Sequence, residues 1–301
     1  MITNEAAISL AGVFPPIPTP FDEEGHVAHG PLTDNVQRWN EHDFAGYVVL
    51  GSNGEMVYLT DQERVEVWET VREGTPADKL MIAGTGCEST RQTIQLSSQA
   101  AAVGADAVLV LTPHYYRGQM TGEALAHHYW SVADALEIPV LLYNMPRFTG
   151  VDMDAPSVTR IAQHPNVVGI KDSGGNVGKL AQIVDSAGAD LQVLAGSASF
   201  FLPALTVGAL GGVMALANVA PQETIDLYDL FQAGRLEEAA RLQRRLIAVN
   251  TAVTAQFGVP GLKAALDILD YYGGPVRSPL QPLGELEIQT LKAILVEGEV
   301  L

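Results

Sequence analysis

Lysine is scarce in this sequence, and one of its five lysines, Lys171, ends an apolar segment at residues 167–170. The amine of a lysine at the end of a buried strand is partly desolvated, which favours the neutral form that can attack a ketone and form a Schiff base. The competing interpretation is an ordinary ion pair between Lys171 and Asp172. The other lysines are expected before a strand or on solvated helix faces: Lys79, Lys179, Lys263 and Lys292.

A tyrosine ends the preceding apolar segment. Tyr143 follows residues 140–142, so its phenol is predicted to lie beside the Lys171 amine if the two strands are neighbours. A phenol can donate a proton and then accept one, and imine formation needs both transfers. The alternative is a rim tyrosine that packs against a loop.

A polar loop between glycines provides a third candidate. Ser52 and Asn53 lie between Gly51 and Gly54, after the apolar segment 46–50. Short side chains and backbone N–H groups in such a loop can bind a carboxylate. Asn-Gly also marks many ordinary turns.

Other kinds of chemistry have weaker support. No pair of the seven histidines has the spacing of metal ligands with a third partner nearby, so we expect no metal. Cys87 has no evident base and is interpreted as a small loop filler. No glycine-rich nucleotide motif follows a strand, so we expect no cofactor.

Eight short, nearly continuous apolar runs alternate with helical segments, which predicts an α/β protein with parallel strands covered on both faces. In a (β/α)₈ TIM barrel the active site lies at the carboxyl ends of the strands, where the candidate residues fall. An open doubly wound sheet shares the pattern, but the count favours the barrel. The expected strands are 13–19, 46–50, 80–85, 107–111, 140–143, 167–171, 192–195 and 211–214.

Helical patterns follow the last strand, at 221–250, 261–269 and 284–295. They exceed the one helix needed to complete a barrel. We therefore expect a barrel at 1–220 and C-terminal helices at 221–301, which include the closing helix and pack on the barrel.

The composition limits the possible partners. Of the 301 residues 47% are apolar, enough for a large core, and the formal net charge of −18 disfavours nucleic acid and anionic membranes. Residues 191–222 carry no charge, but their glycines and Pro203 indicate buried strands and a short helix rather than a membrane span. With a single cysteine and no signal-peptide pattern at residues 1–5, a cytoplasmic protein is expected.

Three motifs in order closely resemble the dihydrodipicolinate synthase / N-acetylneuraminate lyase superfamily of class I aldolases: 46–55 (GYVVLGSNGE), 143–146 (YNMP) and 169–172 (GIKD). The likeness covers nearly the whole chain. It implies that Lys171 forms the Schiff base, that Tyr143 shuttles protons, and that Ser52 and Asn53 hold the substrate carboxylate.

The resemblance extends to two more positions. It implies that Tyr115 reaches the site of a neighbouring subunit in a homotetramer built from dimers. It also implies that Val213 lines the pyruvate pocket.

Two departures disfavour dihydrodipicolinate synthesis. The synthases usually have Thr-Thr where Ser52 and Asn53 stand, and an arginine where Phe148 stands. Arg147 is one position early. Arg147 or Arg117 is expected to bind a distal carboxylate.

Further stretches resemble 4-hydroxy-2-oxoglutarate aldolases, namely 86–90, 112–118, 171–175, 194–198 and 271–275. The expected enzyme is a carbon–carbon lyase acting on a small 2-oxo acid, cleaving 4-hydroxy-2-oxoglutarate to pyruvate and glyoxylate. Alternatives are 4-hydroxy-tetrahydrodipicolinate synthase and a 2-keto-3-deoxy sugar acid aldolase or dehydratase. A 2-oxo-acid sensor without catalysis is the non-enzyme alternative.

Overall fold

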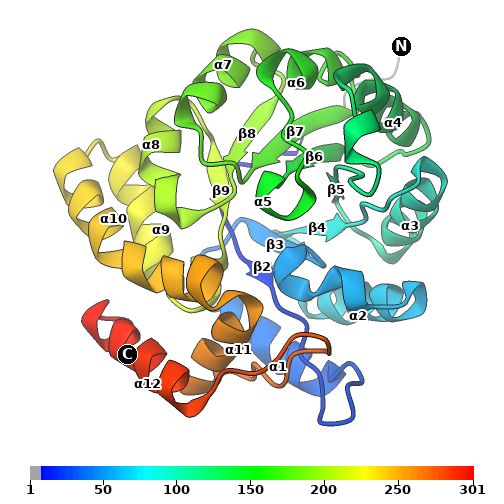
Figure 1. Cartoon of the computed structure of the whole chain (residues 1–301). Coiled ribbons are helices and arrows are strands. Elements are labelled where there is room, and N and C mark those ends of the chain that lie inside the picture. Colours follow the sequence, from blue (N-terminus) through cyan, green and yellow to red (C-terminus); the bar gives the residue numbers. More distant parts are fainter. Residues whose placement is uncertain (1–7) are drawn as a thin grey trace.

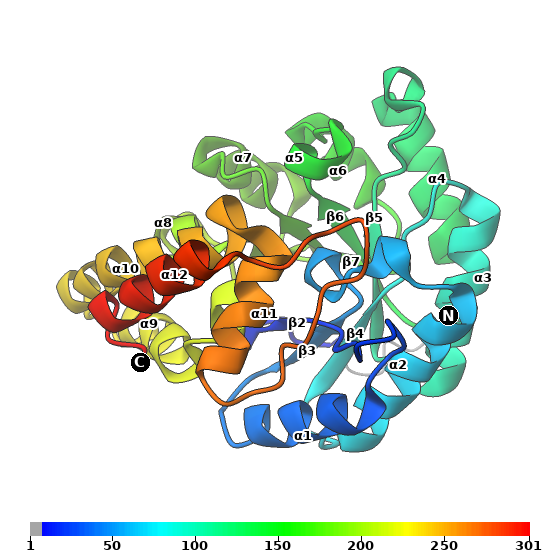
Figure 2. The same ribbon diagram turned by 60° about the horizontal axis from the view of Figure 1, so that its bottom comes forward.

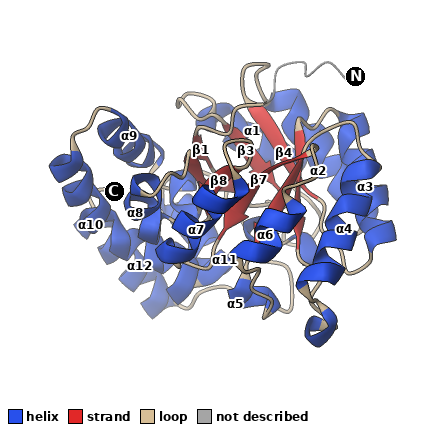
Figure 3. Ribbon diagram, turned by 90° about the horizontal axis from the view of Figure 1, so that it is seen from above, coloured by secondary structure: helices blue, strands red, loops and turns tan. Residues whose placement is uncertain are grey.

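The computed structural model describes residues 8–301, and its strands form a barrel enclosed by helices (Figures 1 and 3). All strand pairs are parallel, in the order β1-β9-β8-β7-β6-β5-β4-β3-β2. The strands are β1 (Gly12–Phe14), β2 (Pro16–Ile17), β3 (Gly46–Val49), β4 (Leu80–Gly84), β5 (Ala107–Leu111), β6 (Val140–Asn144), β7 (Val167–Asp172), β8 (Gln192–Ala195) and β9 (Gly211–Val213). The predicted (β/α)₈ architecture is confirmed.

The first barrel strand is broken, and the prediction of one strand over 13–19 is wrong. Its halves β1 and β2 flank Pro15; β1 pairs with β9 and β2 pairs with β3. Proline has no N–H for a sheet ladder, so this proline-rich segment cannot pair continuously. β1 and β2 are the first and last strands in the strand order. Because only Pro15 separates them in the chain, the sheet closes into a barrel.

The helices are α1 (His29–Trp39), α2 (Asp61–Gly74), α3 (Thr90–Val103), α4 (Gly122–Asp134), α5 (Pro146–Thr149), α6 (Ala155–Ile161), α7 (Val177–Ala187), α8 (Phe201–Thr206), α9 (Pro221–Gln232), α10 (Leu236–Thr251), α11 (Gly258–Ile268) and α12 (Glu285–Glu297). A capping box of Thr60 and Glu63 starts α2. Ser89 caps α3, which ends at Gly104 in the left-handed conformation, φ 95°.

The strands are buried almost throughout, and their side chains join one hydrophobic core with the helix faces that cover them. The uncharged stretch 191–222 forms β8, α8 and β9, as predicted. Within residues 8–301 no helix combines the length and apolar character needed to cross a bilayer. The expectation of no signal peptide at residues 1–5 lies outside the described residues.

After α9 the chain adds α10, the π-helical turn η6 (Ala252–Gln256), α11 and α12 (Figure 2). Buried residues of α10 and α11 belong to the barrel's own core, as Leu246 and Leu262 illustrate. The segment after α11 is tied to α1 by two hydrogen bonds between Asn35 and the backbone of Tyr272. A division at residue 220 stays a prediction.

Two lysines expected on solvated helix faces are buried, so those predictions are wrong. Lys179 pairs with Asp152 and Asp172, and Lys263 pairs with Glu55. Lys79 is buried as well and donates to backbone carbonyls of the α1–β3 connection. Each ammonium has at least one acceptor that lies far away in the sequence, which local patterns do not reveal.

Candidate active site

Lys171 and Tyr143 lie side by side at the carboxyl ends of β7 and β6, where the sheet register pairs them. Lys171 is 2% exposed, and its Nζ lies 4.1 Å from the centre of the Tyr143 ring. The alternative of a rim ion pair with Asp172 is not seen, because the Asp172 carboxylate bonds Lys179 instead. The predicted pairing of an amine with a phenol inside the barrel is confirmed.

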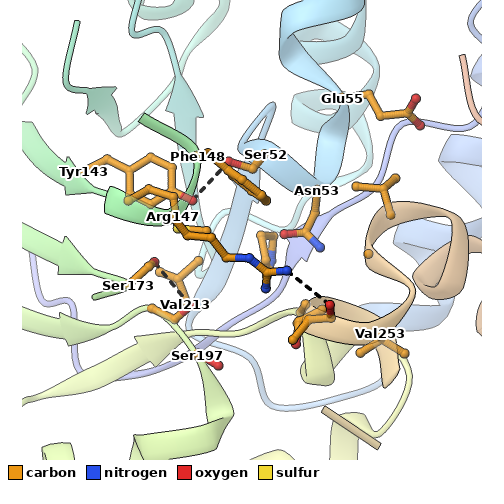
Figure 4. A pocket seen from close by; sticks show the side chains of 18 of the residues that line it. Ser52, Asn53, Glu55, Tyr143, Arg147, Phe148, Ser173, Ser197, Val213 and Val253 are labelled. Carbon is orange, nitrogen blue, oxygen red and sulfur yellow. Dashed lines mark hydrogen bonds between the residues drawn. The ribbon is translucent and has the colours of Figure 1, made fainter. Parts of the chain in front are cut away.

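The loop after β3 brings a hydroxyl to this pair. Ser52 lies in the turn η1 (Ser52–Gly54), and its Oγ is 3.2 Å from the Tyr143 hydroxyl (Figure 4). The turn is bent by non-glycine residues on either side of it, Leu50 at φ 61° and Glu55 at φ 53°. Strain of this kind is retained where the surroundings fix the backbone, often at functional sites.

A cavity of about 920 Å³ opens above Lys171. This volume suits a small organic substrate with its solvent. The structure brings together six of the eight residues named as site candidates, because the cavity is lined by Ser52, Asn53, Tyr143, Arg147, Lys171 and Val213. Further hydroxyl and amide groups line its wall: Ser173, Ser197, Ser199, Asn250 and Thr254.

Arg147 crosses the outer part of this cavity. From α5 its Nη2 donates a hydrogen bond to the carbonyl of Ala255 in η6, at 3.1 Å (Figure 4). The neighbouring Phe148 is 59% exposed at the same rim. Arg117 lies against Gly150 and is absent from the cavity lining. Of the two arginine candidates, the structure therefore places Arg147 at the cavity.

Like Arg117, Tyr115 is a site candidate that the single chain does not bring to the cavity. It is 76% exposed, outside the cavity lining, on the loop that follows β5. Glu88 holds this loop, because its Oε2 accepts from the backbone N–H groups of His114 and Tyr115 at 3.0 and 2.8 Å.

Cys87 lies beside Arg64, with 3.5 Å between Nη1 and Sγ. Burial raises the pKa of its thiol, although Arg64 opposes the shift, so the thiolate that a nucleophile needs is disfavoured. Within residues 8–301 no three His, Cys, Asp or Glu side chains cluster as metal ligands would.

Sequence reasoning missed polar residues that support the site. Asn144 and Asp172, directly after Tyr143 and Lys171, bond each other behind the cavity. Their places in the YNMP and GIKD motifs were a usable signal. No such signal existed for the part of the cavity wall that η6 forms, because nothing in its sequence marks a π-helical turn.

Comparison with known proteins places this geometry in a family. The model of the dihydrodipicolinate synthetase family matches residues 9–297. The chain belongs to this family. A DapA-like lyase of Halobacterium salinarum, itself uncharacterised, is 37% identical over 96% of this chain and 94% of its own length.

Two further relatives of this chain differ in the activity they are named for. A probable mitochondrial 4-hydroxy-2-oxoglutarate aldolase of Emericella nidulans is 35% identical over 96% of this chain and 95% of its own. The structure of a chloride-inhibited dihydrodipicolinate synthase from Acinetobacter baumannii with pyruvate superimposes with a TM-score of 0.93. It shares 30% identity and covers 97% of this chain and all (100%) of that one.

Family membership makes the chain an enzyme, a lyase of the Schiff-base superfamily. The alternative of a non-catalytic sensor has no support among these relatives. Some of these relatives are named as aldolases and others as synthases. Family membership therefore does not determine the substrate, for which the residues that line the cavity are the guide.

Proposed function

We propose that the protein cleaves 4-hydroxy-2-oxoglutarate to pyruvate and glyoxylate through a Schiff base on Lys171. The observation that carries the proposal is a chain of three groups in one cavity: the Lys171 amine over the Tyr143 ring, and the Tyr143 hydroxyl bonded to Ser52. An amine, a proton carrier and a hydroxyl in this order suit imine chemistry.

The reaction begins when the Lys171 amine attacks C2 of the substrate, and loss of water leaves a protonated imine. The C4 hydroxyl proton passes to Tyr143 while the C3–C4 bond breaks and its electron pair moves to the imine nitrogen. Glyoxylate departs and an enamine of pyruvate stays on Lys171. Protonation at C3 and hydrolysis then release pyruvate and restore the amine. Every step uses side chains of this chain and water, with no cofactor.

The two carboxylates of the substrate need separate partners. Ser52, Asn53 and the backbone N–H groups of their turn suit the C1 carboxylate beside the ketone, and Val213 packs against the pyruvate part. Arg147 suits the distal carboxylate, because it and Lys171 are the lysine and arginine side chains that line the cavity. A local cation matters here, since the protein as a whole carries a formal charge of −18.

The principal rival is 4-hydroxy-tetrahydrodipicolinate synthase, the name of a relative from Methanothrix thermoacetophila that is 34% identical over 95% of this chain and 96% of its own. Phe148 stands where synthases usually have an arginine, which favours the aldolase. A 2-keto-3-deoxy sugar acid aldolase or dehydratase is the other rival, since hydroxyl side chains line the wall.

Two coupled assays separate these activities. The proposal predicts glyoxylate and pyruvate in equal amounts from 4-hydroxy-2-oxoglutarate, at a higher kcat/KM than for any 2-keto-3-deoxy sugar acid. It also predicts no condensation of pyruvate with aspartate semialdehyde. Faster condensation than cleavage would identify a synthase and contradict the proposal.

We further propose a cytoplasmic homotetramer in which Tyr115 of one subunit reaches the cavity of its neighbour. The exposure of this side chain supports the idea, because an exposed tyrosine is a common interface residue. Light scattering is expected to give the mass of four chains, and Tyr115→Phe to lower kcat without changing that mass. A monomer with full activity would contradict this arrangement.

A further inference from the structure

Four polar side chains form a closed ring behind the cavity. The Nδ2 of Asn144 donates to Oδ1 of Asp152 and to Oδ2 of Asp172, both at 2.7 Å. The Nζ of Lys179 donates to the same oxygen of Asp152 at 2.5 Å and forms an ion pair with the same oxygen of Asp172 at 2.8 Å. Each of the two carboxylate oxygens thus contacts both nitrogens. The ring joins β6, β7, α7 and the segment between α5 and α6.

Most of the ring is buried. Asn144 and Asp172 have no exposed surface and Lys179 has 8%, whereas the side chain of Asp152 is 55% exposed. Burial disfavours the ammonium, but the hydrogen bonds to Asp152 and Asp172 prevail and raise the pKa of Lys179. Buried ion pairs give little net stability compared with apolar packing. The ring therefore needs an explanation other than stability.

Its place in the strands supplies that explanation. Successive side chains of a strand point to opposite faces, so Tyr143 and Lys171 face the cavity while Asn144 and Asp172 face the helices. The register pairs Tyr143 with Lys171, and Asn144 with Asp172. A register shift interrupts the β6–β7 ladder between Val140 and Leu141. Because this irregularity lies near the amino ends of β6 and β7, the ladder alone does not fix their register. The ring fixes the two strands relative to each other at their carboxyl ends.

The ring also holds the cavity wall. The Oδ1 of Asp172 accepts from the backbone N–H of Gly174 at 2.8 Å, and Gly174 lines the cavity. A Cβ at position 174 would lie 3.1 Å from that oxygen and 3.4 Å from the Lys179 Nζ. The loop therefore packs tightly on the ring.

We propose that Asn144, Asp152, Asp172 and Lys179 are positioning residues that hold the Lys171 amine against the Tyr143 phenol. This inference rests on the proposed Schiff-base chemistry. None of the four lines the cavity. They act through the register of β6 and β7, and displacement of a reacting group by about 1 Å costs about 10²-fold in rate.

The test uses exchange of the pyruvate methyl protons for deuterium in D₂O, followed by NMR, because this reaction needs the imine and its enamine but no aldehyde. Lys179→Met is expected to lower the maximal exchange rate about 10²-fold. The pyruvate concentration at half-maximal rate should change less than about threefold, since Ser52 and Asn53 are untouched. Lys179→Arg should restore part of the rate.

Two further variants separate positioning from general destabilisation. Arg72→Met breaks an ion pair with Asp106 remote from the cavity, 3.0 Å long, and is expected to keep the wild-type rate. Asp152→Ala removes the exposed ring member, so the fold is retained, and should slow exchange roughly tenfold. Wild-type rates in folded Lys179→Met and Asp152→Ala would overturn the inference, as would an equal loss in Arg72→Met. A wild-type protein that exchanges no deuterium would instead contradict the Schiff-base proposal itself.

Discussion

Tyr143 takes part in two steps of the proposed reaction, because its phenol transfers protons in both imine formation and C–C cleavage. Its hydroxyl is held by Ser52 at 3.2 Å, and the ring beneath it faces the Lys171 amine. Tyr143→Phe keeps the ring and removes only the proton carrier. We predict that kcat for aldol cleavage falls about 10²–10⁴-fold while the variant keeps its fold.

The matched control for Tyr143→Phe is Tyr228→Phe, which removes a phenol hydroxyl from α9 on the outside of the barrel. It should leave kcat unchanged. Steady-state kinetics of both variants, with circular dichroism to verify folding, makes the comparison. Full activity in Tyr143→Phe would remove the phenol from the mechanism.

Arg147 is predicted to distinguish a dicarboxylate from pyruvate. In Arg147→Met we expect KM for 4-hydroxy-2-oxoglutarate to rise about 10- to 100-fold, the worth of about 1.5–3 kcal/mol for a hydrogen bond to a charged group. Deuterium exchange into pyruvate, which has no distal carboxylate, should be unchanged. Arg160→Met on the exposed face of α6 is the control. An equal loss of activity in cleavage and in deuterium exchange would show that Arg147 does not bind the distal carboxylate.

At the scale of elements, the C-terminal helices hold the loop that carries Ser52 and Asn53. The Glu55 carboxylate forms an ion pair with the Lys263 Nζ of α11, at 2.6 Å, and accepts a hydrogen bond from the backbone N–H of Arg277 at 2.9 Å. Burial lowers the pKa of Lys263, although Glu55 opposes the shift. The turn η1 is therefore anchored from the far end of the chain.

Removal of this anchor tests its importance. Lys263→Met leaves the buried Glu55 carboxylate without its cation, and we expect the free energy of unfolding in urea to fall by about 3–5 kcal/mol. KM for 4-hydroxy-2-oxoglutarate should rise because the turn loosens. Adding Glu55→Gln should recover part of the stability, whereas Lys292→Met, exposed on α12, should cost almost nothing. A stable Lys263→Met protein with unchanged KM would contradict the anchoring role.

Elements with a local physical cause could be predicted from the sequence. Apolar runs located all eight barrel positions, and the local cap residues Thr60, Ser89 and Gly104 stand at helix ends. The break at Pro15 was visible in principle, because proline cannot donate to a ladder. The π-helical turn η6 and the burial of Lys263 depend on tertiary contacts, so local propensity could not predict them.

The candidate site also contains some residues that could be predicted from the sequence and others that could not. Lys171 and Tyr143 were predictable because parallel strands end at one mouth, so two strand-end residues from neighbouring strands must meet there. The choice between Arg147 and Arg117 was not, because both belong to connecting segments whose paths the strand pattern leaves open. Lys179 was interpreted as solvated because its acceptors Asp152 and Asp172 approach it only in the folded chain.

For the molecule as a whole, one buried histidine links stability to pH. His128 lies on the buried face of α4, with its Nδ1 2.9 Å from the Thr90 hydroxyl. Burial lowers its pKa from 6.5 to about 4. Between these values the unfolded chain binds the proton and the folded chain does not. The contribution of His128 to stability is thus present above pH 6.5 and is lost as the pH falls toward 4.

Urea unfolding at a series of pH values measures this linkage. We predict that the free energy of unfolding falls as the pH is lowered through that window, and that His128→Phe flattens the dependence. His127→Phe, exposed on the same helix, should keep the wild-type slope. Identical slopes in the wild type and His128→Phe would contradict a buried neutral imidazole.

The proposed chemistry depends on a covalent bond between the Lys171 amine and the ketone carbon of a 2-oxo acid. Borohydride added to the protein with pyruvate reduces an imine to a stable amine, and peptide mass spectrometry locates it. We predict a reduced pyruvyl adduct on Lys171 that depends on both reagents and is absent from Lys171→Ala, which should also be inactive. An unmodified Lys171, or full activity in Lys171→Ala, would contradict the account.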